Sequence, residues 1–203
     1  MPRADVAAAY DARAEEYIQR FGTVDRMSAE DRATIESWGD GTVGRILDAG
    51  CGPGHWSGLL ARGGERNVVG IDASARFIGS AQRCIPHVPF LVGDLASLPL
   101  ASGSFGAVLS WFSIIHTAPG EVPATLAEFA RVLSPGGSLL LGFFDGESGV
   151  AFDHAVTTAY RWSVAGLADL FADHGFVVES SSTRQDPVGK RSYGQVSATL
   201  GPT

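Results

Sequence analysis

The chain shows two successive patterns of apolar and polar positions. Over residues 4–20, apolar and aromatic side chains recur every three or four positions with charges between them, which predicts an amphipathic helix. A second helix is predicted over residues 29–38, because Ser28 is a good N-cap and the glycine-rich run Gly39-Asp40-Gly41 follows. Beyond residue 44, short apolar runs alternate with helical stretches. Two helices are therefore expected before a differently patterned core.

In this core, short strands and helices are predicted to alternate along the chain. The predicted strands cover residues 45–49, 68–72, 89–92, 105–111, 138–144, 176–182 and 195–200. The predicted helices cover residues 55–61, 74–84, 123–133 and 164–174, with Ser74 and Ser163 as N-caps and Gly175 as a terminator. Strands this apolar, separated by helices, predict a doubly wound, Rossmann-like α/β sheet that is mostly parallel, with helices on both faces.

The last two predicted strands have no helix between them. Residues 183–194 link them and are largely polar, with Pro187 and Gly189 among them. A link of this length is too short for a parallel crossover. We therefore expect the C-terminal strand to run antiparallel to its neighbour.

Composition limits the location and the partners that we expect. The 203 residues carry 15 Lys and Arg against 22 Asp and Glu, a formal net charge of −7, with no visible basic patch. This balance disfavours a nucleic-acid partner, whose phosphates need a cationic surface. The two cysteines, Cys51 and Cys84, are too few for a disulfide framework or a zinc cluster. Since no apolar run is long enough to cross a bilayer, we expect a soluble, single-domain cytoplasmic protein without a membrane partner or a metal.

The strongest functional signal is a glycine loop, Leu47-Asp48-Ala49-Gly50-Cys51-Gly52-Pro53-Gly54, which leaves the first core strand and opens a helix. Glycines let the backbone approach a ligand closely, and the N–H groups at the start of the next helix are unpaired. The first crossover of a doubly wound sheet is also a place where ligands bind. We interpret the run as a cofactor loop; a tight turn that simply needs glycine is the alternative.

Two carboxylates follow at the ends of the next two predicted strands. Asp72 lies at about the distance from the loop at which a carboxylate meets ribose hydroxyls in dinucleotide folds, and Asp94 follows the third strand. A carboxylate there can accept two charge-assisted hydrogen bonds from a ribose. Each has a structural alternative: Asp72 as a cap of the helix after Ser74, and Asp94 as a cap of the turn that follows it.

Together these motifs resemble the class I S-adenosylmethionine-dependent methyltransferases that act on small molecules. The closely spaced glycines at positions 50, 52 and 54 differ from the dinucleotide pattern, whose final spacing is wider. The resemblance runs from about residue 10 to the end of the chain. Its parts arrive in the family's order: residues 47–54, Ile71-Asp72-Ala73-Ser74, Gly93-Asp94-Leu95, Phe105-Gly106-Ala107-Val108 and Leu133-Ser134-Pro135-Gly136-Gly137.

The resemblance implies a position for each part of S-adenosylmethionine. The loop residues Gly50, Cys51, Gly52 and Gly54 would face its amino acid end, with Asp48 orienting the loop. The ribose would lie on Asp72 and the adenine beside Ala73, with its exocyclic amine donating to Asp94. The backbone N–H of Leu95 would meet the adenine ring, and Ser110 would line the methionine arm.

The resemblance also implies a helical lid over residues 1–42, above a core of residues 43–203. In this family the early helix closes over the cofactor, and the run Tyr10-Asp11-Ala12-Arg13-Ala14-Glu15-Glu16-Tyr17 resembles the family's pattern there. Tyr17 would thus contact the cofactor. The alternative for both tyrosines is a place in the core, on the apolar face of an amphipathic helix.

Methyl transfer from a sulfonium needs alignment, a desolvated path and, for a protonated acceptor, a base. The candidate base is His116, just beyond the fourth core strand; substrate positioning and an ordinary surface role are its alternatives. His55 opens the helix after the glycine loop, where it contacts either the cofactor or solvent. Cys51 has no evident general base beside it, so packing or a backbone contact is favoured over a nucleophilic role.

The methyl acceptor is the part that the sequence constrains least. Eight apolar residues fall in segments expected near the carboxyl edge of the sheet: Trp111, Phe112, Ile115, Phe143, Phe144, Phe152, Tyr160 and Trp162. An acidic, aromatic-lined pocket would suit a neutral or cationic metabolite. Three other function classes stay open: a nicotinamide-dependent oxidoreductase, a non-catalytic S-adenosylmethionine-binding module, and an RNA or protein methyltransferase.

Overall fold

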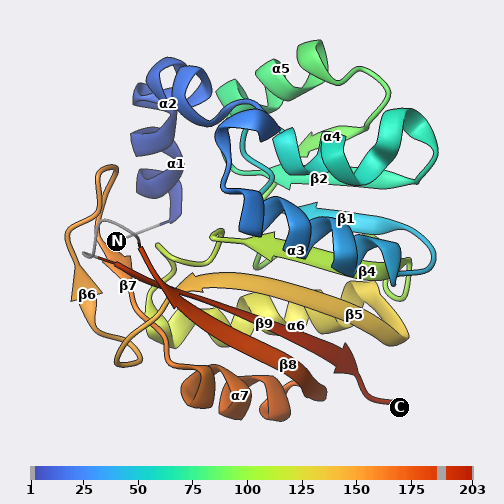
Figure 1. Cartoon of the computed structure of the whole chain (residues 1–203), viewed down its shortest axis with the longest axis vertical. Helices are drawn as coiled ribbons and strands as arrows, with labels where there is room; N and C mark the ends of the chain where they lie inside the picture. The colour runs from blue at the N-terminus through green and yellow to red at the C-terminus, as the bar shows by residue number, and fades with distance from the viewer. Residues whose placement is uncertain (1–2, 187–190, 203) are drawn as a thin grey trace.

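In the computed structural model, which describes residues 3–186 and 191–202, the apolar runs pair into a seven-stranded sheet (Figure 1). Its strand order is β3-β2-β1-β4-β5-β9-β8. The strands are β1 (Ile46–Ala49), β2 (Val68–Asp72), β3 (Phe90–Val92), β4 (Phe105–Trp111), β5 (Leu133–Phe144), β8 (Phe176–Gln185) and β9 (Ser192–Leu200). From β3 to β5 all neighbours are parallel, whereas β9 is antiparallel to both β5 and β8. The predicted sheet with its antiparallel C-terminal strand is confirmed; Pro187 and Gly189 of the predicted link lie outside the described residues.

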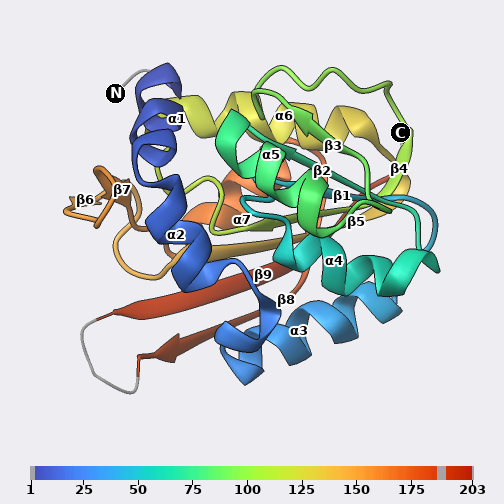
Figure 2. The ribbon, with the colours of Figure 1, turned by 90° about the horizontal axis from the view of Figure 1, so that it is seen from above.

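Helices cover both faces of this sheet, as predicted. One face carries α3 (Ala29–Asp40), α4 (His55–Ala61) and α5 (Ala75–Cys84), and the other carries α6 (Val122–Val132) and α7 (Val164–Asp173) (Figure 2). Alternate strand residues serve the two faces, since Ile46 packs with the first group of helices and Leu47 with the second. Short 3-10 turns occur at Val24–Arg26, Arg62–Gly64 and Pro119–Glu121. No helix in the described part of the chain is long and apolar enough to cross a membrane.

The helix predicted over residues 4–20 is in fact two helices, α1 (Arg3–Ala12) and α2 (Ala14–Phe21). The break falls at Arg13, whose φ of −113° and ψ of 11° are not helical. Its guanidinium donates to the Glu16 carboxylate and to the carbonyl of Ala155, so the break is fixed by contacts on both sides. Both helices contact α5 and lie toward the edge where the parallel strands end (Figure 1).

The third helix differs from the first two, because it belongs to the core. Ile35 is fully buried against the sheet, and the indole N–H of Trp38 donates to Ser138 Oγ on β5 at 2.8 Å. The Ser28 hydroxyl accepts the backbone N–H of Asp31, which confirms the predicted N-cap. The expected helical lid over residues 1–42 therefore contains a helix that covers the face of the sheet.

Other differences from the predicted elements are local. The helix α6 ends at Val132, so Leu133 begins β5 rather than ending the helix. Two short strands, β6 (Ala151–Phe152) and β7 (Ala159–Tyr160), form a separate antiparallel pair that was not predicted. Two-residue strands are too short to show an alternating pattern in the sequence.

The parallel strands bring their carboxyl ends to one edge of the sheet. In register, Asp48 pairs with Gly70 and Asp72 pairs with Val92, so the loops that follow β1, β2 and β3 are neighbours. Because β9 is antiparallel, its beginning lies at the same edge, with Tyr193 opposite Phe144 at the end of β5. Segments from most of the chain length therefore meet there, which is where ligands bind in open α/β sheets.

A buried carboxyl group on the central strand β1 supports the turn into α4. Asp48 is 1% exposed, and it accepts a hydrogen bond of 2.6 Å from the hydroxyl of Ser57 on α4. Burial raises the pKa of Asp48 to about 7, although the hydrogen bond from Ser57 lowers it. Between about pH 4 and pH 7 the unfolded chain loses this proton while the folded chain keeps it, so Asp48 makes folding less favourable as the pH rises.

We expect Asp48→Asn to remove this dependence, since asparagine carries no titrating proton. Relative to wild type, its free energy of unfolding should rise by up to about 4 kcal/mol between about pH 4 and pH 8. Urea unfolding of both proteins across this range measures the difference. The lowered pKa of His55 has the opposite effect but is common to both proteins, so it cancels. Asp173→Asn, at an exposed position, is the matched control. If the free energies of unfolding of Asp48→Asn and wild type differ by the same amount at every pH, the account is contradicted.

Candidate active site

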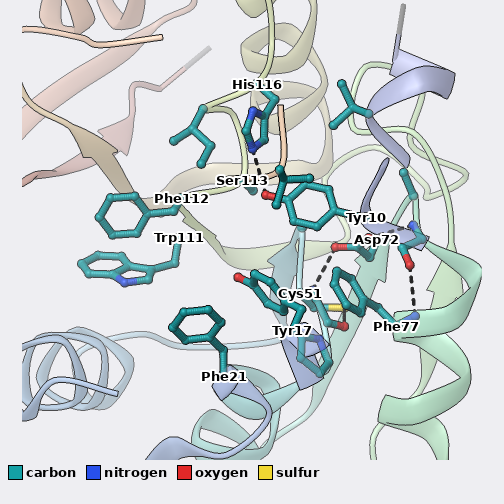
Figure 3. A pocket seen from close by; sticks show the side chains of 18 of the residues that line it. Tyr10, Tyr17, Phe21, Cys51, Asp72, Phe77, Trp111, Phe112, Ser113 and His116 are labelled. Atoms are coloured by element: carbon teal, nitrogen blue, oxygen red, sulfur yellow. Dashed lines mark hydrogen bonds between the residues drawn. The ribbon is translucent and has the colours of Figure 1, made fainter. Parts of the chain in front are cut away.

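A cavity of about 720 Å³ lies at the carboxyl edge of the sheet, within the usual size range of small-molecule sites (Figure 3). Its walls come from α1, α2, the glycine loop, and the segments that follow β2, β3 and β4. The end of β5 and the start of β9 close the remaining side. Of the predicted cofactor residues, those that line it are Tyr17, Gly50, Cys51, Gly52, Asp72, Ala73, Asp94 and Leu95.

The glycine loop turns tightly beside this cavity. Gly50 has a φ of +80°, and a Cβ there would lie 2.2 Å from the Cβ of Ser113, so only glycine fits. Gly52 has a φ of +53°, and a Cβ there would meet nothing within 4 Å. Its backbone is thus open on the side where a side chain would stand. Gly54 is the N-cap of α4 and does not line the cavity.

The Asp72 carboxylate ties the glycine loop to the start of α5. One oxygen accepts the N–H of Gly52 at 2.9 Å and the other accepts the N–H of Ser74 at 2.8 Å. The cap of α5 is Ser74, whose hydroxyl accepts from Phe77, so Asp72 is not the N-cap. A carboxylate has about four acceptor sites, and the two backbone bonds leave room for two hydroxyl donors. Burial raises the pKa of Asp72, and the two backbone hydrogen bonds counter that shift.

Asp94, Ala73 and Leu95 lie together on the wall formed by the segments after β2 and β3. One oxygen of Asp94 accepts the N–H of Ala96 at 2.9 Å. Asp94 therefore caps the turn that follows it, and its side chain also faces the cavity. The two roles are compatible in one residue.

Tyr10 and Tyr17 lie against each other and against Phe77 of α5 (Figure 3). Their ring centroids are 5.7 Å apart, and both rings also line the cavity. Burial raises the pKa of Tyr17 to about 12, so its hydroxyl is protonated at neutral pH. The carboxylate of Asp11, which follows Tyr10 in the sequence, accepts hydrogen bonds from the Ser74 hydroxyl and from the N–H of Arg76. These contacts hold α1 against the residue that caps α5.

The cavity wall carries Ser113 instead of Ser110, the serine that was expected beside the methionine arm. Ser110 is completely buried and does not line the cavity, whereas Ser113, three residues later, does. The two hydroxyls are 2.6 Å apart, so Ser110 supports Ser113 from below. The expectation for Ser110 is not met: β4 spans Phe105–Trp111 as predicted, and within it Trp111 lines the cavity whereas Ser110 does not. Asp48 is likewise beneath the surface of the cavity.

His116 lies in the cavity wall beside Tyr10 (Figure 3), and both of its ring nitrogens are engaged. Its Nδ1 is 2.7 Å from the carbonyl oxygen of Thr158, and its Nε2 is 2.9 Å from the Tyr10 hydroxyl. A carbonyl can only accept, so Nδ1 carries the proton and Nε2 of the neutral ring accepts from Tyr10. Burial lowers the pKa of His116, which keeps Nε2 unprotonated at neutral pH. A simple surface role for His116 is thereby wrong.

His55 and Cys51 are both buried beside the glycine loop. Burial lowers the pKa of His55 to about 4, so the ring is neutral. Within the described residues its Nδ1 has no hydrogen-bond partner although it faces no solvent, which makes the solvent alternative wrong. Burial raises the pKa of the Cys51 thiol, and this favours packing over a nucleophilic role.

The cavity lining carries charges of both signs, with the carboxylates of Glu16, Asp31, Asp72 and Asp94 and the guanidiniums of Arg13, Arg20 and Arg191. The carboxylates of Asp72 and Asp94 lie on the walls after β2 and β3, whereas Arg13, His154 and Arg191 line the opposite part of the same cavity. Four of the eight apolar candidates line the cavity: Trp111, Phe112, Ile115 and Phe144. Phe143 and Trp162 are core residues, Phe152 packs on Phe144, and Tyr160 pairs in β7.

Among the cavity residues that sequence reasoning missed are Ser113, His154, Arg191 and Tyr193. Ser113 could have been found from its place just after a strand end. The other three belong to the segment that carries β6 and β7 and to the start of β9, and no local motif marks them. They reach the cavity only through the pairing of β9 with β5 and through contacts such as the His116–His154 ring pair, with centroids 5.1 Å apart. No group of three metal-ligating side chains occurs in the described ranges.

Comparison with known proteins agrees with this arrangement. Residues 46–137 match the model of a methyltransferase domain family. The chain is similar to the demethylmenaquinone methyltransferase of Beutenbergia cavernae, with 35% identity over 156 residues that cover 71% of this chain and 62% of the relative. The chain spans about half to three fifths of the length of the relatives that it matches.

Solved structures share the fold at lower identity. The [4+2]-cyclase SpnF superposes with a TM-score of 0.82 at 18% identity, covering 98% of this chain and 97% of the other. The 1,6-didemethyltoxoflavin-N1-methyltransferase of Burkholderia thailandensis does so with a TM-score of 0.76 at 20% identity, covering 100% of this chain and 92% of the other. The glycine loop and the sheet of this chain are thus found together with sequence similarity to methyltransferases over residues 46–137, and its fold is that of S-adenosylmethionine-dependent methyltransferases of known structure.

Proposed function

We propose that this chain transfers a methyl group from S-adenosylmethionine to a small-molecule acceptor by in-line displacement. One observation carries the proposal: the glycine loop, Asp72, Asp94 and a neutral histidine, His116, all face one cavity. The Burkholderia methyltransferase of the same fold holds S-adenosylhomocysteine together with its acceptor, which supports the choice of donor. Relatives are named for acceptors as different as demethylmenaquinone and malonyl-[acyl-carrier protein], so the acceptor does not transfer by similarity.

The residues around the glycine loop suit the two ends of the donor. Asp72 has room for the two ribose hydroxyls, and the open backbone at Gly52 admits the amino acid end. Ala73, Asp94 and Leu95 would hold the adenine on the wall after β2 and β3. When bound, the donor supplies a methyl group on a sulfonium sulfur, which leaves as a neutral thioether.

The lid in this proposal is narrower than residues 1–42. It comprises α1 and α2, which bring Tyr10 and Tyr17 over the cavity, while α3 is a fixed part of the core. The contact between Asp11 and Ser74 would hold the lid next to the Asp72 carboxylate. Donor entry would therefore require that α1 moves away from α5, and donor binding would favour its return.

His116 is proposed as the base for a protonated acceptor. The bond from Nδ1–H to the Thr158 carbonyl fixes the ring and leaves the Nε2 lone pair directed into the cavity, where Tyr10 now donates to it. An acceptor hydroxyl or amine that takes the place of Tyr10 at Nε2 could lose its proton to His116 as its lone pair attacks the methyl carbon. Positioning of the acceptor by the same nitrogen is the alternative, and it involves no proton transfer to His116.

The remaining parts of the proposal concern location and partners. The cysteines Cys51 and Cys84 are free thiols, as suits a cytoplasmic protein. The net charge of −7 favours a small molecule over nucleic acid as acceptor. Two alternatives keep the fold, namely a nicotinamide-dependent oxidoreductase and a module that binds S-adenosylmethionine without methyl transfer. Binding of NAD rather than S-adenosylmethionine would identify the oxidoreductase, and binding of S-adenosylmethionine without methyl transfer would identify the binding module.

Calorimetric titration tests the donor. We expect S-adenosylmethionine and S-adenosylhomocysteine to bind wild type in the micromolar range, and NAD not to bind. Asp72→Ala should weaken the binding of both by about a hundredfold, because two charge-assisted hydrogen bonds to the ribose are lost. The control Asp173→Asn, on the exposed end of α7, should bind as wild type does, and thermal unfolding confirms that each variant is folded. Binding of NAD alone would overturn the proposal.

The kinetic test of His116 uses an isosteric variant. His116→Asn can keep the bond to the Thr158 carbonyl through its amide N–H₂ but has no base at the Nε2 position. With acceptors drawn from phenols, amines and thiols, we expect its kcat to fall by about a hundredfold or more, with donor affinity unchanged. Only neutral His116 can accept a proton, and the pKa of His116 is lowered. The activity of wild type should therefore fall only when the pH drops below the ordinary pKa of a histidine.

Tyr10→Phe serves as the matched control for this test. It removes the hydroxyl that occupies Nε2 but leaves the base in place, so its kcat should fall by less than about tenfold. The acid limb of the pH profile should persist in Tyr10→Phe and be absent in His116→Asn. If the activity of both variants falls at the same acidic pH, the group that titrates is not His116.

A further inference from the structure

The part of the cavity farthest from the glycine loop has a cationic and aromatic lining, which we call the distal end. Its cationic or ionisable members are Arg13, His154 and Arg191, and its aromatic wall is formed by Phe112, Phe144 and Tyr193. The three aromatic rings contact one another, with centroids 5.3 to 5.7 Å apart. The guanidinium of Arg191 lies 5.6 Å from the centroid of Phe144. A flat apolar surface and a fixed cation thus lie next to each other.

Carboxylates also line the cavity beside the distal end, and each is already paired: Asp31 with Arg184, at 2.5 Å between the charged atoms, and Glu16 with Arg13. Arg13 is paired with Glu16, with a distance of 2.9 Å between the charged atoms. Arg191, by contrast, forms no ion pair with a carboxylate in the part of the chain that the structure describes. The pKa of His154 is lowered to about 4, first by burial and then by electrostatic repulsion from the neighbouring basic groups His116, Arg191 and Arg13. His154 is therefore neutral, and Arg191 is the cation left to meet a ligand.

The position of Arg191 separates it from the donor. In the sheet order β1-β4-β5-β9, the strand that follows Arg191 is three places from the strand that precedes the glycine loop. Three strand spacings amount to roughly 14 Å across the sheet. An anion at Arg191 is thus expected to belong to the acceptor, while the amino acid end of the donor stays near Gly50 and Gly52.

We propose that the methyl acceptor is a planar aromatic acid, whose anionic group pairs with Arg191 while its ring packs on Phe144 and Tyr193. This inference rests on the proposed methyltransferase function and names its class of acceptor. A carboxylate can take two parallel hydrogen bonds from a guanidinium, and the aromatic wall orients the ring. A hydroxyl on the far side of the ring would then point toward His116. The reaction would release S-adenosylhomocysteine and a methyl ether, with the hydroxyl proton taken up at Nε2.

Three compounds that share a para-hydroxyphenyl ring and carry an anionic, a neutral or a cationic group opposite the hydroxyl test the proposal: para-hydroxybenzoate, para-hydroxybenzamide and para-hydroxybenzylamine. A hydroxynaphthoate with its amide and its amine extends the series to a larger ring. Each is titrated calorimetrically into wild type saturated with S-adenosylhomocysteine, so that binding is measured without turnover. In at least one ring series the acid should bind about tenfold or more tightly than its amide, and the amine should bind most weakly.

The variants Arg191→Gln and Arg191→Lys test whether Arg191 causes the preference for the acid over the amide. Arg191→Gln should abolish the preference for the acid and leave the affinity for S-adenosylhomocysteine unchanged, whereas Arg191→Lys should keep part of it. Arg62→Gln, a surface arginine outside the cavity, is the matched control and should keep all of it. No preference for the acid in either ring series would overturn the inference, as would weakened donor binding in Arg191→Gln, which would assign Arg191 to the donor.

The two proposals fail in different ways. A protein that does not bind S-adenosylhomocysteine at all contradicts the proposed function. A protein that binds S-adenosylhomocysteine but discriminates against aromatic acids contradicts only the acceptor class.

Discussion

The arrangement of the donor half depends on one buried carboxylate. Asp72 accepts a backbone N–H from the glycine loop and another from the start of α5, and Ser74 in turn donates to Asp11 on α1. A carboxylate without donors would be costly at this depth, as the raised pKa of Asp72 shows. The two backbone donors stabilise it and at the same time fix the distance between the ends of β1 and β2. The loop and the helix α5 are therefore joined through Asp72, and the lid is joined to them through Ser74.

The opposite half of the cavity is built by a different principle. The antiparallel strand β9 starts where the parallel strands end, and it brings Tyr193 and the neighbouring Arg191 next to Phe144. The segment with β6 and β7 adds His154 and the carbonyl of Thr158, which orients His116. The donor half thus uses the ends of parallel strands, and the distal half uses segments that the parallel sheet leaves free to vary. This division fits a fold whose members, such as the cyclase and the toxoflavin-precursor methyltransferase, are described with different activities.

Much of the fold and of the donor half could be predicted from the sequence, because their signals are local. The apolar runs identified β1, β2 and β4 almost to the residue, and the serine caps at positions 28, 74 and 163 were confirmed. The break at Arg13 could not be predicted, since it depends on the distant carbonyl of Ala155. The same holds for Arg191 and His154, which reach the cavity through strand pairing and ring contacts between residues far apart in sequence. The sequence placed Ser110 correctly in β4, but which serine reaches the cavity depends on the turn after the strand, where Phe112 has a φ of +53°.

The central claim is that the donor and the acceptor occupy opposite halves of one cavity, divided by the segment from Trp111 to His116. A crystal structure of the protein with S-adenosylhomocysteine tests it most directly. The account predicts that the ribose hydroxyls lie on the Asp72 carboxylate and that the sulfur points toward His116, while the surface formed by Phe144, Tyr193 and Arg191 stays uncovered. Electron density for the ligand across Phe144 and Arg191, with Asp72 uncontacted, would contradict it.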